Sequence, residues 1–206
     1  MEKWVVTAKK ADFQGIGRKY GIDPVIARII RNRDITGDEA IEEYLNGTLA
    51  DIPSWKLLKD IDKAVEIISG KIDAGTKMRI IGDYDIDGVT ATYILLKGFK
   101  RLGANVDTYI PDRVADGYGI HDHLIKKAME DGIDTIVTCD NGISASSQIT
   151  YAKELGMTVV VTDHHEVPFT DTEEGRTYIL PPADAIINPK QADCTYPNKN
   201  ICGAVV

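Results

Sequence analysis

Cysteine is scarce in this chain of 206 residues, and its three cysteines, Cys139, Cys194 and Cys202, form no CxxC pair. An odd number of cysteines without close pairs argues against a disulfide framework and against a structural zinc site. Long apolar runs are also missing, because none approaches the roughly 20 residues that a membrane-spanning helix needs. The N-terminus lacks the basic and then apolar pattern of a signal peptide. We therefore expect a cytoplasmic protein without a membrane segment.

Positive charge is in the minority, and the net charge of -8 argues against a protein that binds nucleic acid over its whole surface. The charge is uneven, because residues 1–33 hold eight Lys or Arg against three Asp or Glu, and the remainder has a balance of -13. A basic arm beside an acidic body suits a polyanionic partner held near cation-binding carboxylates. The alternative is that these basic side chains are simply solvated residues on helix surfaces and bind no partner.

The first part of the chain, residues 1–55, is predicted to be a small N-terminal helical region followed by a linker. A short strand is expected at residues 4–6. One helix is expected to begin after Asp23, and another at Thr36, which forms a capping-box pattern with Glu39. This region is expected to be distinct from the domain that follows.

The second part, residues 56–206, alternates short apolar runs with longer helical patterns. Strands are expected at residues 78–81, 106–110, 133–138, 157–162 and 185–187. Helices are expected at residues 60–74, 89–102, 121–130 and 144–155, with a long loop at residues 163–182. This alternation predicts an α/β domain with a mostly parallel sheet of about five strands and helices on both faces.

Carboxylates follow four of the predicted strands. In open parallel sheets, binding sites form at the carboxyl ends of the strands, so these residues are expected to share one edge. In chain order they and their polar neighbours are Asp83, Asp85 and Asp87, then Asp112 and Arg113, then Asp140 and Asn141, and finally Asp163, His164 and His165. Four such clusters are hard to explain as solvated turns alone. A purely conformational role in the turn remains open for Asp140 and Asn141.

Carboxylates with imidazole and without thiolates favour Mn²⁺ or Mg²⁺ over zinc or copper. Several carboxylates in one site suggest two ions that share a bridging Asp, an arrangement suited to hydrolysis of a phosphate ester or anhydride. Neighbouring side chains on an extended backbone point in opposite directions. Of His164 and His165, we therefore expect one to face a metal and the other to contact substrate or donate a proton.

The acidic run at residues 83–88 has two other interpretations. Its first positions fit a calcium-binding EF-hand loop, but the twelfth position is Ile94 instead of Glu, and a strand precedes the run. The run also resembles the nucleophile motif of haloacid-dehalogenase-type phosphatases. The segment that begins at Asp163 lacks that family's late acidic pattern, so this remains a distant enzyme alternative.

Three motifs together resemble the DHH phosphoesterases, and within that family its single-strand-DNA-specific exonucleases. They are Gly-Asp-Tyr-Asp-Ile-Asp-Gly at residues 82–88, Thr-Cys-Asp-Asn-Gly at residues 138–142, and Asp-His-His at residues 163–165. Further segments of the same likeness lie at residues 111–113, 117–119, 188–189 and 202–204. The likeness spans nearly the whole chain, including the leading helices.

The resemblance implies a hydrolase that uses two Mn²⁺ or Mg²⁺ ions to release 5′-mononucleotides from single-stranded DNA in the 5′→3′ direction. By position, the implied metal ligands are Asp83, Asp85, Asp140 and His164, with Asp140 as the bridge. His165 is the implied contact to the scissile phosphate, Asp87 and Asp163 would orient the ligands, and Arg113 and Asn141 would contact phosphate. The resemblance also implies a role in DNA repair and recombination, with a helicase or a single-strand-binding protein as partners.

Two departures from the family pattern matter. Some relatives carry His where this chain has Ile81, and the family's ligand set includes a further Asp downstream of the Cys-Gly-Ala segment, whereas this chain ends at Val206. We therefore expect the domain at residues 56–206 to be truncated at its C-terminal end and the chain to be an N-terminal fragment. Two alternatives follow: a DHH enzyme for oligonucleotides, cyclic dinucleotides or pyrophosphate, and a non-catalytic nucleic-acid-binding fragment.

Overall fold

The computed structural model describes residue 3 and residues 9–117, 119–173 and 175–206. These residues form two compact units, one ending at Ile52 and one running from Pro53 to Val206. The strand expected at residues 4–6 lies outside the described residues. The domain boundary expected after residue 55 stays a prediction.

Short helices make up the first unit. They are α1 (Phe13–Tyr20), α2 (Pro24–Asn32), α3 (Asp38–Asn46) and the 3₁₀ turn η1 (Leu49–Asp51). The Asp23 side chain accepts a hydrogen bond from the Val25 N–H and caps α2, as the sequence predicted. The capping box expected at Thr36 is wrong, because α3 begins after Gly37, whose φ of 85° only glycine adopts readily, and no side chain caps it.

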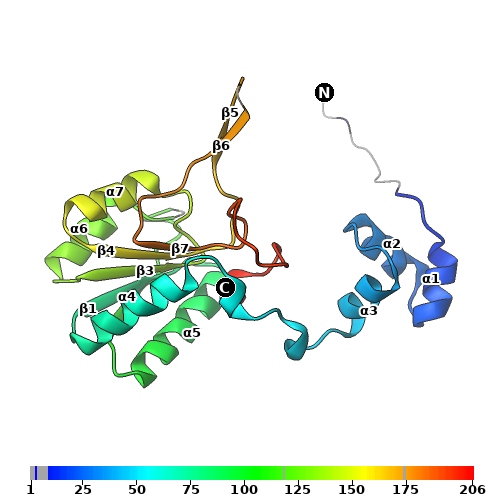
Figure 1. Cartoon of the computed structure of the whole chain (residues 1–206), viewed down its shortest axis with the longest axis horizontal. Coiled ribbons are helices and arrows are strands. Elements are labelled where there is room, and N and C mark those ends of the chain that lie inside the picture. The colour runs from blue at the N-terminus through cyan, green and yellow to red at the C-terminus, as the bar shows by residue number, and fades with distance from the viewer. Residues whose placement is uncertain (1–2, 4–8, 118, 174) are drawn as a thin grey trace. The chain divides into compact units, whose positions relative to one another are not determined.

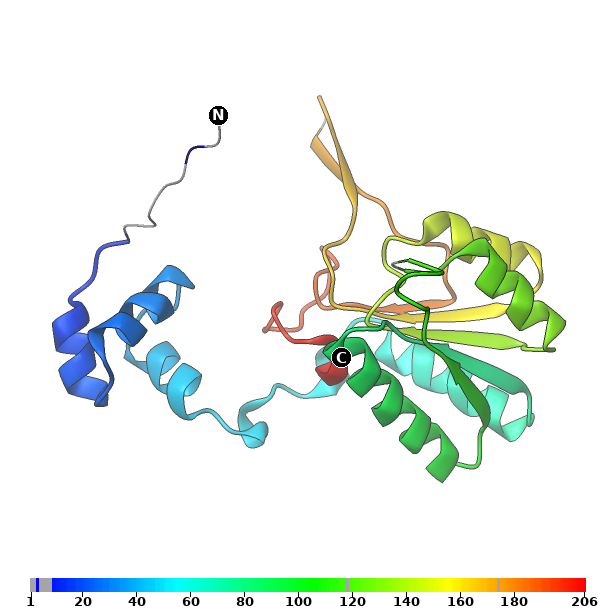
Figure 2. The same cartoon turned by 180° about the vertical axis from the view of Figure 1, so that it is seen from behind.

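Within the described residues of the second unit, five parallel strands form one sheet in the order β2–β1–β3–β4–β7. Their bounds are β1 Lys77–Ile81, β2 Asn105–Tyr109, β3 Thr135–Cys139, β4 Thr158–Thr162 and β7 Ala185–Ile187. The helices are α4 Ile61–Asp73, α5 Ile86–Arg101, α6 Asp122–Glu130 and α7 Ser146–Glu154, with 3₁₀ turns η2 Trp55–Leu57 and η3 Gly203–Val205. Figure 1 shows α4 and α5 on one face of the sheet and α6 and α7 on the other, and Figure 2 shows the same layers from behind. The expected fold class is confirmed.

The inner strands are buried on both sides because helices cover both faces of the sheet and successive strand residues point to opposite faces. On the side of α4 and α5, the core includes Ile80 and Val137, whereas Ile81 and Ile136 belong to the core on the side of α6 and α7. The inner strands are therefore largely apolar in sequence, whereas the edge strand β2 contains Asn105 and Asp107 and is only partly buried.

The chain order of the strands reverses at β1, which pairs with β2 on one side and with β3 on the other. The helix that follows β1, α5, lies on one face of the sheet, and the helix that follows β3, α7, lies on the other (Figure 1). The loops that leave β1 and β3 therefore diverge. In doubly wound sheets this switch point is the place where ligands bind.

Three local expectations differ from the structure. Helix α5 begins at Ile86, three residues before the predicted start, because the Asp85 side chain accepts from the N–H groups of Asp87 and Gly88 and caps it. Helix α7 begins at Ser146, so Ser144 is not its cap. The loop predicted at residues 163–182 contains an antiparallel hairpin of β5 (Phe169–Thr172) and β6 (Gly175–Tyr178), which projects from the sheet in Figure 1. No helix in the described part of the chain is long and apolar enough to cross a membrane.

Candidate metal centre

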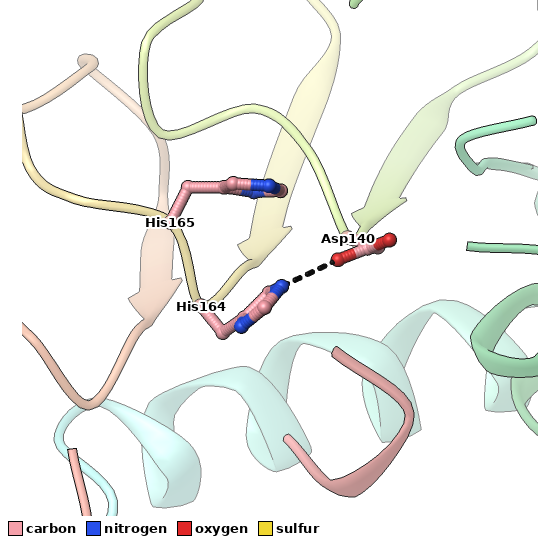
Figure 3. A group of neighbouring side chains, drawn as sticks. All are labelled: Asp140, His164 and His165. Atoms are coloured by element: carbon pink, nitrogen blue, oxygen red, sulfur yellow. Dashed lines mark ion pairs between the residues drawn. The ribbon is translucent and has the colours of Figure 1, made fainter. Parts of the chain in front are cut away.

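Acidic and imidazole side chains from three strand ends meet at the switch point of the sheet. In the described part of the chain, possible ligand atoms of Asp83, Asp85 and Asp140 lie within 4.8 Å of one another, and so do those of Asp140, His164 and His165. Asp140 belongs to both groups and therefore lies between them. Figure 3 shows His164 and His165 on the loop after β4, with both rings directed toward Asp140 at the end of β3.

Asp140 is 1% exposed and has a positive φ of 59°, a conformation that Asp tolerates better than most residues. Its Oδ1 lies 3.0 Å from His164 Nε2, yet this oxygen has no hydrogen-bond partner of acceptable geometry among the described residues. Burial, followed by the charges of Asp87 and Asp85, raises the pKa of Asp140 to about 7. A cation between these carboxylates would give the Asp140 oxygen a partner and would offset the repulsion between the negative charges.

Asp83 is held at the end of β1 and is 2% exposed. Its Oδ1 accepts the Tyr84 N–H at 2.7 Å, and burial, together with the Asp85 charge, raises its pKa. Gly88, in the first turn of α5, packs directly on this residue, since a Cβ at Gly88 would lie 2.6 Å from the Asp83 Cβ. Glycine at this position therefore lets the start of α5, with Asp85 at its cap, approach Asp83.

The His165 ring is oriented by Asp163, whose Oδ1 lies 2.7 Å from His165 Nδ1. The other Asp163 oxygen accepts the Ile143 N–H at 2.9 Å. Burial acts to raise the pKa of Asp163, but the hydrogen bonds from His165 and Ile143 outweigh it, so the pKa is lowered. The same bond with Asp163 raises the pKa of His165. On the backbone side, Asn188 Nδ2 donates to the His165 carbonyl oxygen at 3.0 Å.

The rings of the two histidines do not point in opposite directions as they would on an extended backbone, whereas the separate roles expected for them stay predictions. The ring centroids of His164 and His165 lie 4.6 Å apart, and both rings belong to the group around Asp140. The physical reason is that β4 ends at Thr162 and the chain bends at His165, so the alternation of an extended strand no longer applies.

Asp87 connects the cluster to the distant segment at η3. Its Oδ2 accepts the Gly203 N–H at 2.6 Å, its Oδ1 accepts the Ala204 N–H at 2.8 Å, and its Oδ2 lies 3.5 Å from His164 Nε2. A Cβ at Gly203 would lie 2.5 Å from Asp140 Oδ1. The sequence interpretation assigned no role to Gly203, Ala204 or Asn188, although both segments belonged to the motifs on which the family resemblance rested.

The remaining predicted residues lie outside the two groups. Asp112 forms its own turn by accepting the N–H groups of Val114 and Ala115, so the edge strand β2 adds no carboxylate to the cluster. Arg113 is exposed, and its guanidinium carbon lies 5.3 Å from the centre of the Tyr84 ring. Asn141 is buried beside Asp140, and its roles in phosphate contact and turn geometry both stay predictions.

The sequence of this chain is similar to that of a known protein family and to several of its members. Residues 77–206 match the N-terminal domain of the DHH family. The chain is 37% identical over 186 residues to the single-stranded-DNA-specific exonuclease RecJ of Escherichia coli strain K12, which covers 90% of this chain and 30% of the relative. It is 35% identical over 205 residues to the RecJ of Bacillus subtilis strain 168, covering 99% of this chain and 25% of that protein.

Solved structures of RecJ proteins are also similar to this chain. The crystal structure of an exonuclease RecJ bound to manganese has a TM-score of 0.61 and 31% identity, over 71% of this chain and 35% of that one. The RecJ of Thermus thermophilus in complex with Mn²⁺ has a TM-score of 0.58 and 26% identity, over 93% of this chain and 25% of that one. The chain thus spans between a quarter and a third of the length of the curated relatives described above.

Proposed function

Because this chain belongs to the DHH family, we propose that it acts as a metal-dependent phosphodiester hydrolase that removes 5′-mononucleotides from single-stranded DNA in the 5′→3′ direction. The observation that carries the proposal is the buried Asp140 oxygen, which has no hydrogen-bond partner among the described residues and lies between two groups of possible ligands. The RecJ relatives are single-stranded-DNA-specific exonucleases, which supports the choice of single-stranded DNA as substrate.

The donor set fits Mn²⁺ or Mg²⁺, because carboxylate oxygens dominate it and no thiolate takes part. We assign Asp83, Asp85, Asp140 and His164 as the residues that would hold two ions, with Asp140 shared. The manganese in the RecJ structures supports this choice of ion. When bound, such ions would supply activation of water and stabilisation of charge on the leaving oxygen.

His165 is proposed to contact the scissile phosphate. Its Nδ1 is held by Asp163, and the raised pKa favours the imidazolium form, which donates to a phosphate oxygen more strongly than a neutral ring does. Asp163 thereby acts as the residue that positions His165. Asp87 is proposed to position His164 while it holds the backbone of Gly203.

Phosphates farther along the strand need positive charge outside the acidic cluster. Arg113 is exposed on the loop after β2 and is proposed as one such contact. The basic residues among positions 1–33 are proposed to add non-specific affinity for the strand. Asn141, which is buried beside Asp140, is proposed as a second phosphate contact.

The test is hydrolysis of a 3′-labelled single strand by the full chain in Mn²⁺, compared with the same sequence as a blunt duplex. Release of mononucleotides from the 5′ end of the single strand is expected, with loss of activity in Asp140→Ala. The matched control is Asp62→Ala, which removes an exposed carboxylate on α4. Cleavage of dinucleotides or pyrophosphate without cleavage of the long strand would contradict the proposal.

Two further proposals rest on the family resemblance alone. We propose that the chain works in the cytoplasm in DNA repair or recombination, and that a helicase or a single-strand-binding protein supplies or presents its substrate. Titrating a single-strand-binding protein or a helicase into the hydrolysis assay tests the second proposal. A rate that neither protein changes would count against it.

A further inference from the structure

Asn188 lies directly after β7, beside the loop that carries the Asp-His-His tripeptide. It is 0% exposed, so both ends of its side-chain amide need partners inside the protein. The Nδ2 group donates to the His165 carbonyl oxygen at 3.0 Å, and Oδ1 accepts the Lys190 N–H at 2.8 Å. These two bonds also fix the orientation of the amide, because exchanging its oxygen and nitrogen would break both of them.

The backbone pairing of β4 with β7 stops before His165. It runs through Thr162 and Ile187, and the Asp163 N–H then donates to the Ile187 carbonyl oxygen at 3.0 Å. β7 ends at Ile187, and Pro189, two residues farther on, has no N–H group with which to continue the ladder. The side chain of Asn188 therefore supplies the next link between the two chain segments.

His165 is held at its ring and at its backbone by two different residues. Asp163 Oδ1 lies 2.7 Å from His165 Nδ1 and sets the direction of the ring. Asp163 and His165 belong to the same turn, however, so this bond does not by itself anchor the far end of the turn to the sheet. Asn188 provides that anchor at the His165 carbonyl oxygen.

The anchor is separate from the residues proposed to hold a metal. Among the described residues, the Asn188 side chain bonds to His165 and Lys190 and to none of the four proposed metal ligands. Loss of this side chain should therefore displace His165 while the carboxylates around Asp140 keep their places. A donor to the scissile phosphate acts only at hydrogen-bond distance, so a small displacement lowers the rate steeply.

We propose that Asn188 is a positioning residue for the hydrolysis and holds His165 where its ring reaches the scissile phosphate. The inference rests on the proposed function, from which it takes the contact between His165 and phosphate. Asn188 acts through His165 and not on the substrate. Its effect on the rate should therefore disappear in a protein that lacks the His165 ring.

Gln191 offers a matched control in the same turn. It is also a buried amide, 3% exposed, and its Nε2 donates to the Ile186 carbonyl oxygen at 2.8 Å. Among the described residues its side chain bonds to the carbonyl oxygens of Ile186 and Asn188 and to no residue of the Asp-His-His tripeptide. Gln191→Ala is therefore expected to lower the melting temperature about as much as Asn188→Ala does, without displacing His165.

The test is single-turnover hydrolysis of single-stranded DNA by the full chain in Mn²⁺, with Mn²⁺ affinity measured by calorimetry. Asn188→Ala is expected to slow hydrolysis about 10- to 100-fold and to keep the Mn²⁺ affinity within about twofold of wild type. Gln191→Ala is expected to stay within about threefold of the wild-type rate. Equal slowing in the two variants, or lost Mn²⁺ affinity in Asn188→Ala, would overturn the inference.

A double-mutant cycle separates positioning from a general loss of structure. In a His165→Ala background, Asn188→Ala is expected to slow hydrolysis by less than about twofold, because the ring that it positions is gone. A further loss of about 10-fold or more would show that Asn188 acts elsewhere, and the inference would be wrong.

Asn188→Ser is the second variant, since a serine hydroxyl still forms the turn with the Lys190 N–H but is too short to reach the His165 carbonyl oxygen. It is expected to slow hydrolysis as much as Asn188→Ala does, with a smaller loss of stability. A wild-type rate in Asn188→Ser would also overturn the inference.

Hydrogen exchange in the metal-free chain reports the anchor without any hydrolysis. The N–H groups of His164 and His165 donate to Asp163 Oδ1, and Asn188→Ala is expected to speed their exchange about tenfold, with no change in Gln191→Ala. If this difference appears but the wild-type chain cleaves no DNA, the anchoring of His165 stands and the exonuclease proposal is wrong. If the wild-type chain cleaves DNA and both variants exchange alike, the role of Asn188 is wrong and the exonuclease proposal stands.

Discussion

Asp163 Oδ1 lies 2.7 Å from His165 Nδ1 and also accepts the backbone N–H groups of His164 and His165. The first residue of the Asp-His-His tripeptide therefore fixes both the backbone turn and the ring orientation of the last. Because these bonds are local, the ring of His165 keeps its direction without help from the residues proposed to hold a metal.

His165→Ala is expected to leave Mn²⁺ affinity nearly unchanged and to slow hydrolysis of single-stranded DNA by about 10²- to 10³-fold, the usual cost of losing one donor to a transition state. Calorimetry measures the affinity, and single-turnover kinetics measures the hydrolysis rate. Asp163→Asn serves as the comparison, since it keeps the ring but weakens its orientation, and an intermediate rate is expected. Loss of metal binding in His165→Ala would refute the separate roles of the two histidines.

Asp140→Asn is expected to stabilise the metal-free protein at high pH. The pKa of Asp140 is raised to about 7, so its ionisation in the fold costs free energy, and stability is lost as pH rises from the unfolded-state pKa toward 7. At pH 8 the Asn variant is expected to be more stable by about 2–4 kcal/mol, with no advantage near pH 4.

Thermal unfolding at pH 4, 6 and 8 with a chelator measures this difference. In Mn²⁺ the wild-type protein is expected to be more stable than the Asn variant, because it gains binding free energy that the variant lacks. An equal gain from Mn²⁺ in both proteins would show that Asp140 holds no ion.

Gly203→Ala is expected to lower Mn²⁺ affinity by about tenfold while the fold persists, because the new methyl group would press on Asp140 Oδ1. The control is Gly98→Ala in α5, where a Cβ meets no atom within 4 Å. That variant is expected to gain about 0.5–1 kcal/mol of stability and to keep its metal affinity. Titration calorimetry and thermal unfolding report the two effects, and unchanged affinity in Gly203→Ala would contradict the close approach.

Asp131→Asn is expected to destabilise the protein at pH 7 but not in acid. Asp131 has a lowered pKa through its bonds with Lys127 and then Arg79, whose Nη1 lies 3.0 Å from its Oδ2. A lowered pKa gives stability that is present above the unfolded-state pKa and lost as pH falls through the folded-state pKa. The melting temperatures of variant and wild type should converge as the pH falls below about 4. A constant difference at all pH values would indicate lost packing instead.

Reversing Arg28, Arg31 and Arg33 to Glu is expected to weaken binding to single-stranded DNA and to flatten its dependence on salt, because each phosphate contact releases counterions. Fluorescence anisotropy over a range of salt concentrations measures the slope. The control reverses an equal number of exposed lysines in the second unit, Lys63, Lys100 and Lys126. An unchanged slope would mean that the three arginines are solvated surface residues that do not contact the DNA.

The inner strands were predictable because they are short, largely apolar runs between polar loops, and each observed strand of the parallel sheet overlaps its predicted range. Helix α1 was not predicted, since Gly15 and Gly17 lower helix propensity. Gly17 is nevertheless needed there, because a Cβ would lie 2.8 Å from the Ile22 carbonyl oxygen. The hairpin of β5 and β6 was missed because its residues are exposed on both faces and carry no apolar alternation.

The sequence by itself determined the layers of the second unit and the acidic residues at its strand ends, because periodicity and turn chemistry are local properties of the chain. Only the tertiary structure decided which strand ends meet. Pairing of β1 with β3 brings Asp83 to Asp140, while Asp112 on the edge strand stays apart. The bonds from Gly203 and Ala204 to Asp87 cross more than a hundred residues. Such contacts depend on strand order and loop geometry, which no local spacing encodes.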